Sequence, residues 1–264
     1  MKRVGRPANV DGPKVLERAL SVLDLFTERR PEWTMTDISE AAGLPVSTTY
    51  RIVNALEYHG LLRHAGAGYR LGVAAVSLGR RASAGFDMVA ALHPVLEGLA
   101  LEVGETAVLS IFDATHIGAL CIDRIEAPQQ LRLSMEVGSM VPLHAGASAK
   151  AVLASQGDEV LEAVVARPLP RLAANTITDP ERLREEVRTI REQGHAVSFE
   201  ETNAGAWGLA VPILGGDGLG IAVIGLAAPI SRHSDAVQRE ATRALREACR
   251  RAATILRVGV DGAD

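Results

Sequence analysis

The sequence of 264 residues is poor in aromatic residues and cysteine, and it contains no long apolar run. Aromatic residues make up 3% of the chain, so a core must be built mainly from Leu, Val, Ile and Ala. The two cysteines, Cys121 and Cys249, form no C-x-x-C pair, which argues against a disulfide framework and excludes a zinc site built on cysteines. No apolar run approaches the roughly 18 residues of a membrane span, and none follows the basic N-terminus. We therefore expect a cytoplasmic protein that makes no contact with a membrane.

The composition is that of a globular protein with an uneven distribution of charge. Hydrophobic residues make up 47% of the chain and charged residues 23%, which excludes a disordered or fibrous chain. Residues 1–86 carry 12 basic and 8 acidic side chains, whereas residues 87–264 carry 16 and 24. A basic first third predicts an anion-binding module joined to a unit that does not bind anions, and ordinary scatter is the alternative.

The first third of the chain has the pattern of three helices and a β-hairpin. An apolar stripe at 3/4 spacing over residues 15–26 predicts the first helix. Thr36 is the expected N-cap of a short second helix that ends at Gly43. A third helix is expected over residues 47–59, and a Gly-rich turn at residues 65–68 predicts a hairpin. This order is typical of a winged helix-turn-helix, which we place at residues 13–72, behind a flexible basic arm at residues 1–12.

The polar face of the third helix favours DNA binding. Ser47, Thr48, Arg51 and Asn54 lie opposite the apolar residues of that helix. Ser, Thr, Arg and Asn suit base edges and phosphate oxygens, whereas a helix that needs only solubility usually carries Glu and Lys. A purely structural helical subdomain is the alternative.

The remainder of the chain predicts a linker helix and an α+β domain. Residues 73–87 are expected to form the linker, which either carries part of a dimer interface or packs on the second domain, or does both; Pro94 should start, kink or interrupt the helix that follows. The second domain is placed at residues 88–260, with a mainly antiparallel sheet. Its expected strands are residues 106–112, 118–125, 131–135, 209–214 and 219–227, and its expected helices are residues 147–154, 158–166, 180–193 and 234–258.

The sequence contains no pattern typical of an enzyme, and we expect no catalytic residue, cofactor or metal. Residues 216–220 are Gly-rich but lack the P-loop pattern, and they join two strands, so a hairpin turn is expected. There is no G-x-S-x-G motif, and the seven histidines form no H-x-x-x-H pair. Glu200 and Glu201 would face opposite ways in a strand, so they are better read as solvated or as strand-end hydrogen-bonding groups.

Residues 138–150 are unusually rich in small side chains and run from a strand end into a helix start. Such a segment brings backbone N–H groups close to a ligand and offers a helix N-terminus to a carboxylate. Close packing of the helix on the sheet would need the same small residues. The residues alone leave both interpretations open.

Several fragments, in this order and spacing, resemble the IclR family of bacterial transcriptional regulators. VLERALSVLDLF, TMTDISEAAGLPVSTTYRIVNALEYHGLL and YRLG carry the resemblance in the first domain. GETAVLSIFD, DRIEAPQQLRLSMEVGSMVPLHAGASAKAVLA, NTITDPERLREEVRTIREQGHAVSFEE and AVIGLAAPISRHSD carry it in the second. The resemblance implies a winged helix that binds double-stranded operator DNA, a GAF-like domain that binds a small-molecule effector, and a homodimer or homotetramer. It implies repression of a metabolic operon, with activation as the alternative.

The resemblance also assigns the DNA contacts. They are Ser47, Thr48, Thr49, Arg51 and Asn54 in the third helix, and Arg63 and Arg70 in the wing. The position of Thr49 is commonly apolar in the family, and here it falls on the core face. The arm Gly5-Arg6-Pro7 resembles a minor-groove hook, and a disordered arm is the alternative.

The implied effector pocket is less polar than in members that bind small keto acids. Ser198 stands where an acidic residue is common, Gly208 where a Cys or small residue is common, and Gly225 and Ala227 where serines are common. We therefore expect a roomier pocket and a larger or more apolar effector, such as an aromatic or branched organic acid. The expected lining residues are Met140, Leu143, His144, Ala145, Ser198, Trp207, Gly208, Gly225 and Ala227.

Two other classes of protein compete with this reading. One is a metabolite-binding enzyme fused to a DNA-binding domain, which the missing catalytic motifs disfavour. The other is an adaptor whose winged helix binds protein, which would show no salt-dependent affinity for DNA.

Overall fold

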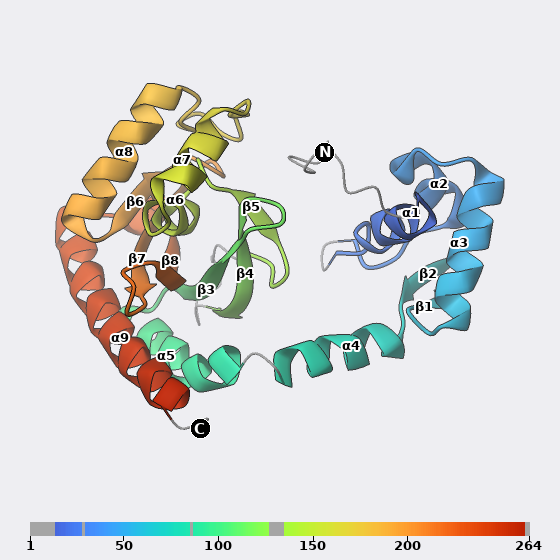
Figure 1. The fold of residues 1–264 in the computed structure, drawn as a ribbon, viewed down its shortest axis with the longest axis horizontal. Helices are drawn as coiled ribbons and strands as arrows, with labels where there is room; N and C mark the ends of the chain where they lie inside the picture. Colours follow the sequence, from blue (N-terminus) through green and yellow to red (C-terminus); the bar gives the residue numbers. More distant parts are fainter. Residues whose placement is uncertain (1–13, 28–29, 85–86, 127–134, 262–264) are drawn as a thin grey trace. The chain divides into compact units, whose positions relative to one another are not determined.

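The computed structural model describes residues 14–27, 30–84, 87–126 and 135–261. The chain forms two compact units that divide between Asp87 and Met88 (Figure 1). No helix in the described ranges is both long and apolar enough to cross a membrane. The arm at residues 1–12 and most of the strand expected at residues 131–135 lie outside the described residues.

Over its described residues, the first unit consists of four helices and a two-stranded hairpin. They are α1 (Lys14–Leu23), α2 (Met35–Ala42), α3 (Val46–Tyr58), β1 (Leu62–Ala65), β2 (Gly68–Leu71) and α4 (Val73–Ala84). Helix α1 ends before Phe26, yet Phe26 is buried in the core of the unit. The amides of Leu25 and Phe26 bond to the carbonyls three residues earlier, so a tightened turn keeps the apolar spacing after the helix has ended.

The start of α2 corrects the sequence prediction. Thr34, not Thr36, is the N-cap: its backbone is extended and its hydroxyl accepts a hydrogen bond from the Asp37 amide at 3.3 Å. Thr36 already lies in the first turn of the helix. The expected end is confirmed, because Gly43 adopts the left-handed conformation with φ of 63°.

The wing is anchored to the rest of its unit by an additional bridge. Strands β1 and β2 pair antiparallel, with Arg63 opposite Arg70. Trp33 and Tyr69 exchange both backbone hydrogen bonds, at 3.1 and 2.8 Å. A Cβ atom on Gly68 would lie 2.7 Å from the carbonyl oxygen of Trp33, so this close approach requires glycine.

The described part of the second unit is built on an antiparallel sheet of six strands in the order β5-β4-β3-β8-β7-β6. The α+β class with an antiparallel sheet is as expected. The strands are β3 (Thr106–Asp113), β4 (Gly118–Ile125), β5 (Met140–Pro142), β6 (Ala196–Phe199), β7 (Ala206–Leu214) and β8 (Gly220–Pro229). The helices are α5 (Asp87–Val103), α6 (Ala147–Ala154), α7 (Asp158–Val165), α8 (Pro180–Gln193), the short 3-10 helix η1 (Ile230–Arg232) and α9 (Asp235–Asp261).

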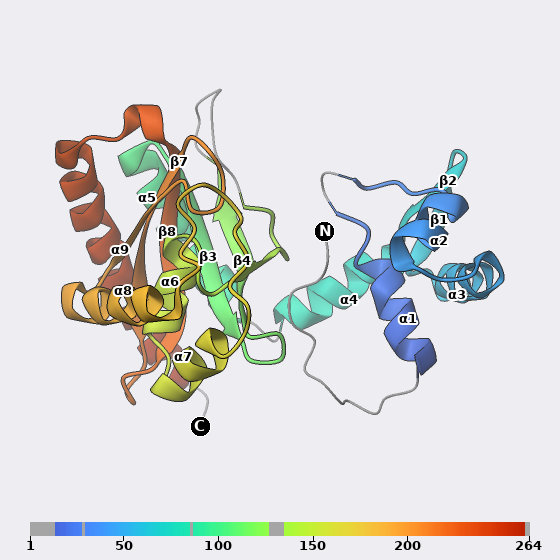
Figure 2. The same cartoon turned by 90° about the horizontal axis from the view of Figure 1, so that it is seen from above.

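Helices cover both faces of this sheet (Figures 1 and 2). Helices α5 and α9 pack on one face, in a core that includes Leu96, Leu209 and Leu245. Helices α6, α7 and α8 pack on the other face, in a core that includes Leu153 and Leu183. Since successive strand residues point to opposite faces, the two cores divide the side chains of each strand between them.

Three local features bear on the sequence predictions. Helix α5 is continuous through Pro94, which therefore neither starts nor interrupts it. The Gly-rich segment between β7 and β8 is a hairpin turn, as expected, in which the Gly215 amide donates to the Leu219 carbonyl at 2.7 Å. Strands β5 and β6 were not predicted as separate elements; they are three and four residues long, too short for a clear alternation.

Candidate functional sites

The outward face of α3 gathers the polar side chains that the sequence singled out. Ser47, Arg51 and Asn54 are exposed and Thr48 is half-buried, while Ile52, Val53 and Leu56 are buried against α1 and α2. The helix therefore presents hydroxyl, guanidinium and amide groups together to solvent, which is the chemistry needed to contact phosphates and base edges.

Thr49 does not belong to this face. Its side chain is fully buried, and its hydroxyl donates to the Pro45 carbonyl at 3.2 Å, one turn earlier. A side chain enclosed in this way cannot reach DNA, so the assignment of Thr49 as a DNA contact is wrong. Apolar residues are common at this position in the family, which agrees with the place of Thr49 in the core.

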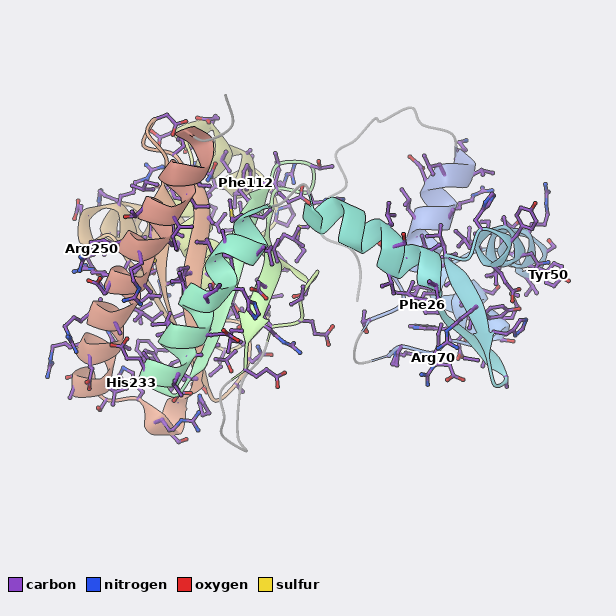
Figure 3. All side chains as sticks on the ribbon, turned by 90° about the horizontal axis from the view of Figure 1, so that it is seen from below. Phe26, Tyr50, Arg70, Phe112, His233 and Arg250 are labelled. Carbon is purple, nitrogen blue, oxygen red and sulfur yellow. The ribbon has the colours of Figure 1, made fainter. Side chains whose placement is uncertain are left out.

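Tyr50 is a candidate contact that the sequence argument missed. It is 55% exposed, and it projects from α3 away from the other helices of the unit (Figure 3). It lies three residues after Ser47 and four before Asn54, so helical spacing alone would have placed it on the polar face.

The two wing arginines are exposed but differ in their surroundings. The guanidinium of Arg70 forms an ion pair with Glu32, with Nε and Nη2 at 3.1 and 3.0 Å from the same carboxylate oxygen. Arg63 lies directly across the hairpin from Arg70. A phosphate near the wing would therefore compete with Glu32 for Arg70. The Gly5-Arg6-Pro7 arm lies outside the described residues.

In the second unit, the small residues expected to line a pocket are cross-strand neighbours. Ser198 lies opposite Gly208, which in turn lies opposite Ala227, and Gly225 lies opposite Ala210. All of them are on the sheet face that α6 covers. The structure thus brings Ser198, Gly208, Gly225 and Ala227 together.

The glycines on this face make room for α6. A Cβ atom on Gly225 would lie 2.3 Å from the Ser148 hydroxyl, and one on Gly208 would lie 3.3 Å from the Ala147 Cβ atom. Close packing of helix on sheet therefore accounts for both glycines. The expectation of a roomier pocket at these two positions is wrong, because the helix occupies the space that the missing side chains leave.

The N-terminus of α6 is closed by internal acceptors. The Gly146 amide donates to the Glu201 carboxylate at 2.9 Å, and the Ala147 amide donates to the Ser198 hydroxyl at 3.0 Å. These amides are among those that an anion would bind at a helix N-terminus. An acidic ligand at this point would take the place of side chains that already bind there.

Lys150 completes this arrangement, and its role was not predicted. Its side chain is 1% exposed, and its ammonium donates to Glu201 and Glu186, both at 2.6 Å, and to the Val197 carbonyl at 2.9 Å. Burial raises the pKa of the Glu201 carboxyl above its ordinary value, although Lys150 and the Gly146 amide act in the opposite direction. The signal in the sequence was a lysine within an otherwise small and apolar helix start.

Trp207 lies on the opposite face of the sheet from this group. It is buried in the core beside α5 and α9, and its ring lies 6.5 Å from that of Phe199 and 5.0 Å from that of His233. Its assignment to the effector pocket is therefore wrong. Trp207 and Gly208 are adjacent in a strand, so their side-chain positions face opposite ways.

The LHA segment is buried. Leu143 and Ala145 are closed off from solvent, with Leu143 in the core beside α6. His144 Nε2 donates to the Pro170 carbonyl at 2.9 Å, and burial lowers the pKa of this imidazole. His144 is thus bound to the loop after α7, whereas Met140, in the edge strand β5, is exposed to solvent.

Comparison with protein families decides the identity of the chain. The model of the IclR helix-turn-helix domain matches residues 15–66, and the model of the C-terminal region of the bacterial transcriptional regulator IclR matches residues 81–254. The chain belongs to the IclR family. Members of the IclR family are transcriptional regulators, so the resemblance seen in the sequence is confirmed.

Individual IclR-family proteins match over most of their length. The HTH-type transcriptional regulator Rv1719 of Mycobacterium tuberculosis is 34% identical over 221 residues, covering 83% of each chain. The transcriptional repressor IclR of Escherichia coli is 29% identical over 242 residues, covering 89% of this chain and 88% of its own. The crystal structure of an IclR homolog from Microbacterium hydrocarbonoxydans in complex with 4-hydroxybenzoate superposes with a TM-score of 0.81 at 31% identity, covering 92% of this chain and 99% of its own.

Proposed function

We propose that this IclR-family regulator is a repressor that binds operator DNA through α3 and the wing and responds to an organic acid bound in its second unit. The observation that carries the proposal is the exposed polar face of α3, with Arg51 and Asn54 on a helix whose other side is buried. The relatives from Escherichia coli and Salmonella typhimurium, which are named repressors, support the direction of regulation.

The chemistry of the face suggests a division of roles. Arginine pairs with guanine or phosphate, and asparagine pairs with adenine in the major groove. Ser47, at the start of the helix, is suited to a phosphate oxygen, and Arg63 in the wing to a neighbouring phosphate. Arg51 and Asn54 are therefore the residues we assign to base reading.

The first unit has an apolar surface that suits a second copy. Val15 and Leu16 of α1 are 69% and 55% exposed, and Val73 and Val76 of α4 are 79% and 59% exposed. Apolar patches of this kind mark association sites on small domains. We propose a homodimer joined through α1 and α4, which presents two α3 helices to a palindromic operator.

The effector is proposed to act at the N-terminus of α6. A carboxylate there would compete with Glu201 and Ser198 for the Gly146 and Ala147 amides. The 4-hydroxybenzoate complex of a 31% identical relative favours an aromatic acid.

The test is DNA binding by full-length protein and two variants. A footprint on the DNA upstream of its own gene locates the operator, and fluorescence anisotropy then gives the affinity. Arg51→Ala should weaken binding by about 1 to 3 kcal/mol, while Arg188→Ala on α8 should leave it unchanged. Equal affinities of wild type and Arg51→Ala would contradict the proposal.

Effector binding is tested separately by calorimetry. Wild-type protein is titrated with 4-hydroxybenzoate and with pyruvate, and the operator affinity is measured again in the presence of each. Tighter binding of the aromatic acid, with a change in operator affinity, supports the proposal. Tighter binding of pyruvate would refute the expected preference for an aromatic effector.

A further inference from the structure

The second unit carries a strongly basic groove, although that part of the chain is acidic overall. The groove has a volume of about 500 Å³ and lies along α9, beside His195. Four of its lining residues are Arg239, Arg243, Arg246 and Arg250. Their spacing of three or four residues puts them on one side of the helix, over a length of about 16 Å. Figure 3 shows nitrogen-tipped side chains along the outer side of this helix, with Arg250 labelled.

Among the described residues, only Arg250 of these four arginines forms an ion pair with a carboxylate. Arg184, Arg191 and Arg232, elsewhere in the same unit, each bind a carboxylate at 2.6 to 2.7 Å. In contrast, over the described ranges no carboxylate forms an ion pair with Arg239 or Arg243.

The other two arginines of the groove, Arg246 and Arg250, already have partners within the second unit. Arg246 donates to the Gln193 carbonyl at 2.6 Å and lies 3.4 Å from His195 Nδ1. Arg250 pairs with Glu247, which also lies 3.9 Å from Arg251. Arg239 and Arg243 are therefore the arginines most available to a ligand.

We propose that this groove binds an oligophosphate, either the phosphate chain of a nucleotide or an inorganic chain. The planar guanidinium forms paired hydrogen bonds with phosphate oxygens. The row of four arginines is too long for a single small anion to contact all of them. The groove volume lies in the range of small-molecule sites.

The lining also argues against a protein partner. Besides the arginines and His195, the groove is lined by Gln238 and Thr242, so it offers no apolar side chain. Protein interfaces usually place aromatic anchors beside arginine, and no aromatic or aliphatic side chain lines this groove. A ligand whose surface is almost entirely charged fits better.

The experiment is calorimetric titration of full-length protein with tripolyphosphate and, separately, with ATP. The test variant is Arg239→Gln/Arg243→Gln, and the control is Arg188→Gln/Arg251→Gln, which removes the same charge outside the groove. We expect wild type and control to bind equally, and the test variant to bind about 100-fold more weakly, at roughly tenfold for each arginine. Tighter binding of ATP than of tripolyphosphate would identify the nucleotide as the source, and the reverse order would identify the inorganic chain.

Three results would overturn the proposal. The first is no binding to wild type at millimolar ligand, and the second is an equal loss of affinity in test variant and control, which would indicate general charge attraction. The third is a change in subunit number of the test variant in sedimentation velocity, which would make the groove a contact between copies. Circular dichroism checks that both variants fold. Operator binding is measured independently, so failure here leaves the proposed function untouched.

Discussion

Replacing the buried Lys150 by methionine should destabilise the second unit severely. The ammonium is 1% exposed and makes three hydrogen bonds, two of them to carboxylates at 2.6 Å. Methionine fills similar volume but leaves the Glu201 carboxylate buried without its cation. Breaking a buried ion pair in this way costs about 3 to 5 kcal/mol. Glu186 is partly exposed, so its contribution is screened by water.

The pH dependence distinguishes this cause from simple loss of packing. Burial already raises the pKa of Glu201, and Lys150 opposes that rise, so Lys150→Met should raise the pKa further. A carboxyl whose pKa is raised on folding binds protons more tightly in the folded state, so stability falls as pH rises through the window between the two pKa values. The deficit of Lys150→Met should therefore be largest at neutral pH and shrink as pH falls towards the ordinary pKa of Glu.

The assay is urea denaturation of wild type and variant between pH 5 and 7.5. Because the chain has two units, the transitions must be assigned separately. Trp33 and Trp207 lie in different units, and single Trp→Phe backgrounds report on each. Only the transition of the second unit should change. Adding Glu201→Gln to the Lys150→Met variant should restore part of the lost stability. A deficit below about 1 kcal/mol, or one independent of pH, would refute the account.

Five further substitutions test three smaller features. Thr34→Ala should cost the first unit about 1 kcal/mol through loss of the α2 cap, whereas Thr36→Ala should cost much less; equal losses in chemical denaturation would contradict the cap assignment. Glu32→Ala should release Arg70 and tighten DNA binding at low salt, measured by anisotropy, while Arg70→Ala should weaken it; a change in the same direction for both would count against competition. Gly225→Ser should destabilise the second unit by about 1 to 3 kcal/mol through overpacking against α6. An unchanged midpoint of urea denaturation would show that α6 moves to accommodate the larger side chain at little cost.

The sequence predicted the long elements because their periodicity persists over many residues. The terminal helix and the strands β3, β7 and β8 bury regular sets of side chains, and α8 has the predicted bounds of residues 180–193, with Asp179 and Gly194 as its caps. Short elements contain too few residues for a periodic pattern to be recognised. Thr34 and Thr36 have the same side-chain chemistry, and only the structure shows that Thr34, not the predicted Thr36, accepts the bond.

The errors in the candidate effector site have a common physical origin. Small residues at strand positions where other family members commonly carry acidic or serine side chains suggested empty space, but the sequence does not say which helix packs on those strands. Helix α6 fills that space at Gly208 and Gly225. Trp207 was included for its proximity in sequence, whereas strand alternation sends it to the other core.

The proposed effector site at the N-terminus of α6 has a consequence for binding energy. The first amides of α6 are bound by Glu201 and Ser198, so a carboxylate gains only the difference between its own bonds and those it displaces. Displacing Glu201 would leave Lys150 facing one fewer carboxylate, which links occupancy of the site to the buried network. By thermodynamic linkage, an effector that weakens operator binding must itself bind more weakly to the operator complex, by the same factor. Calorimetry with and without operator DNA measures both factors, and unequal values would rule out a single coupled equilibrium.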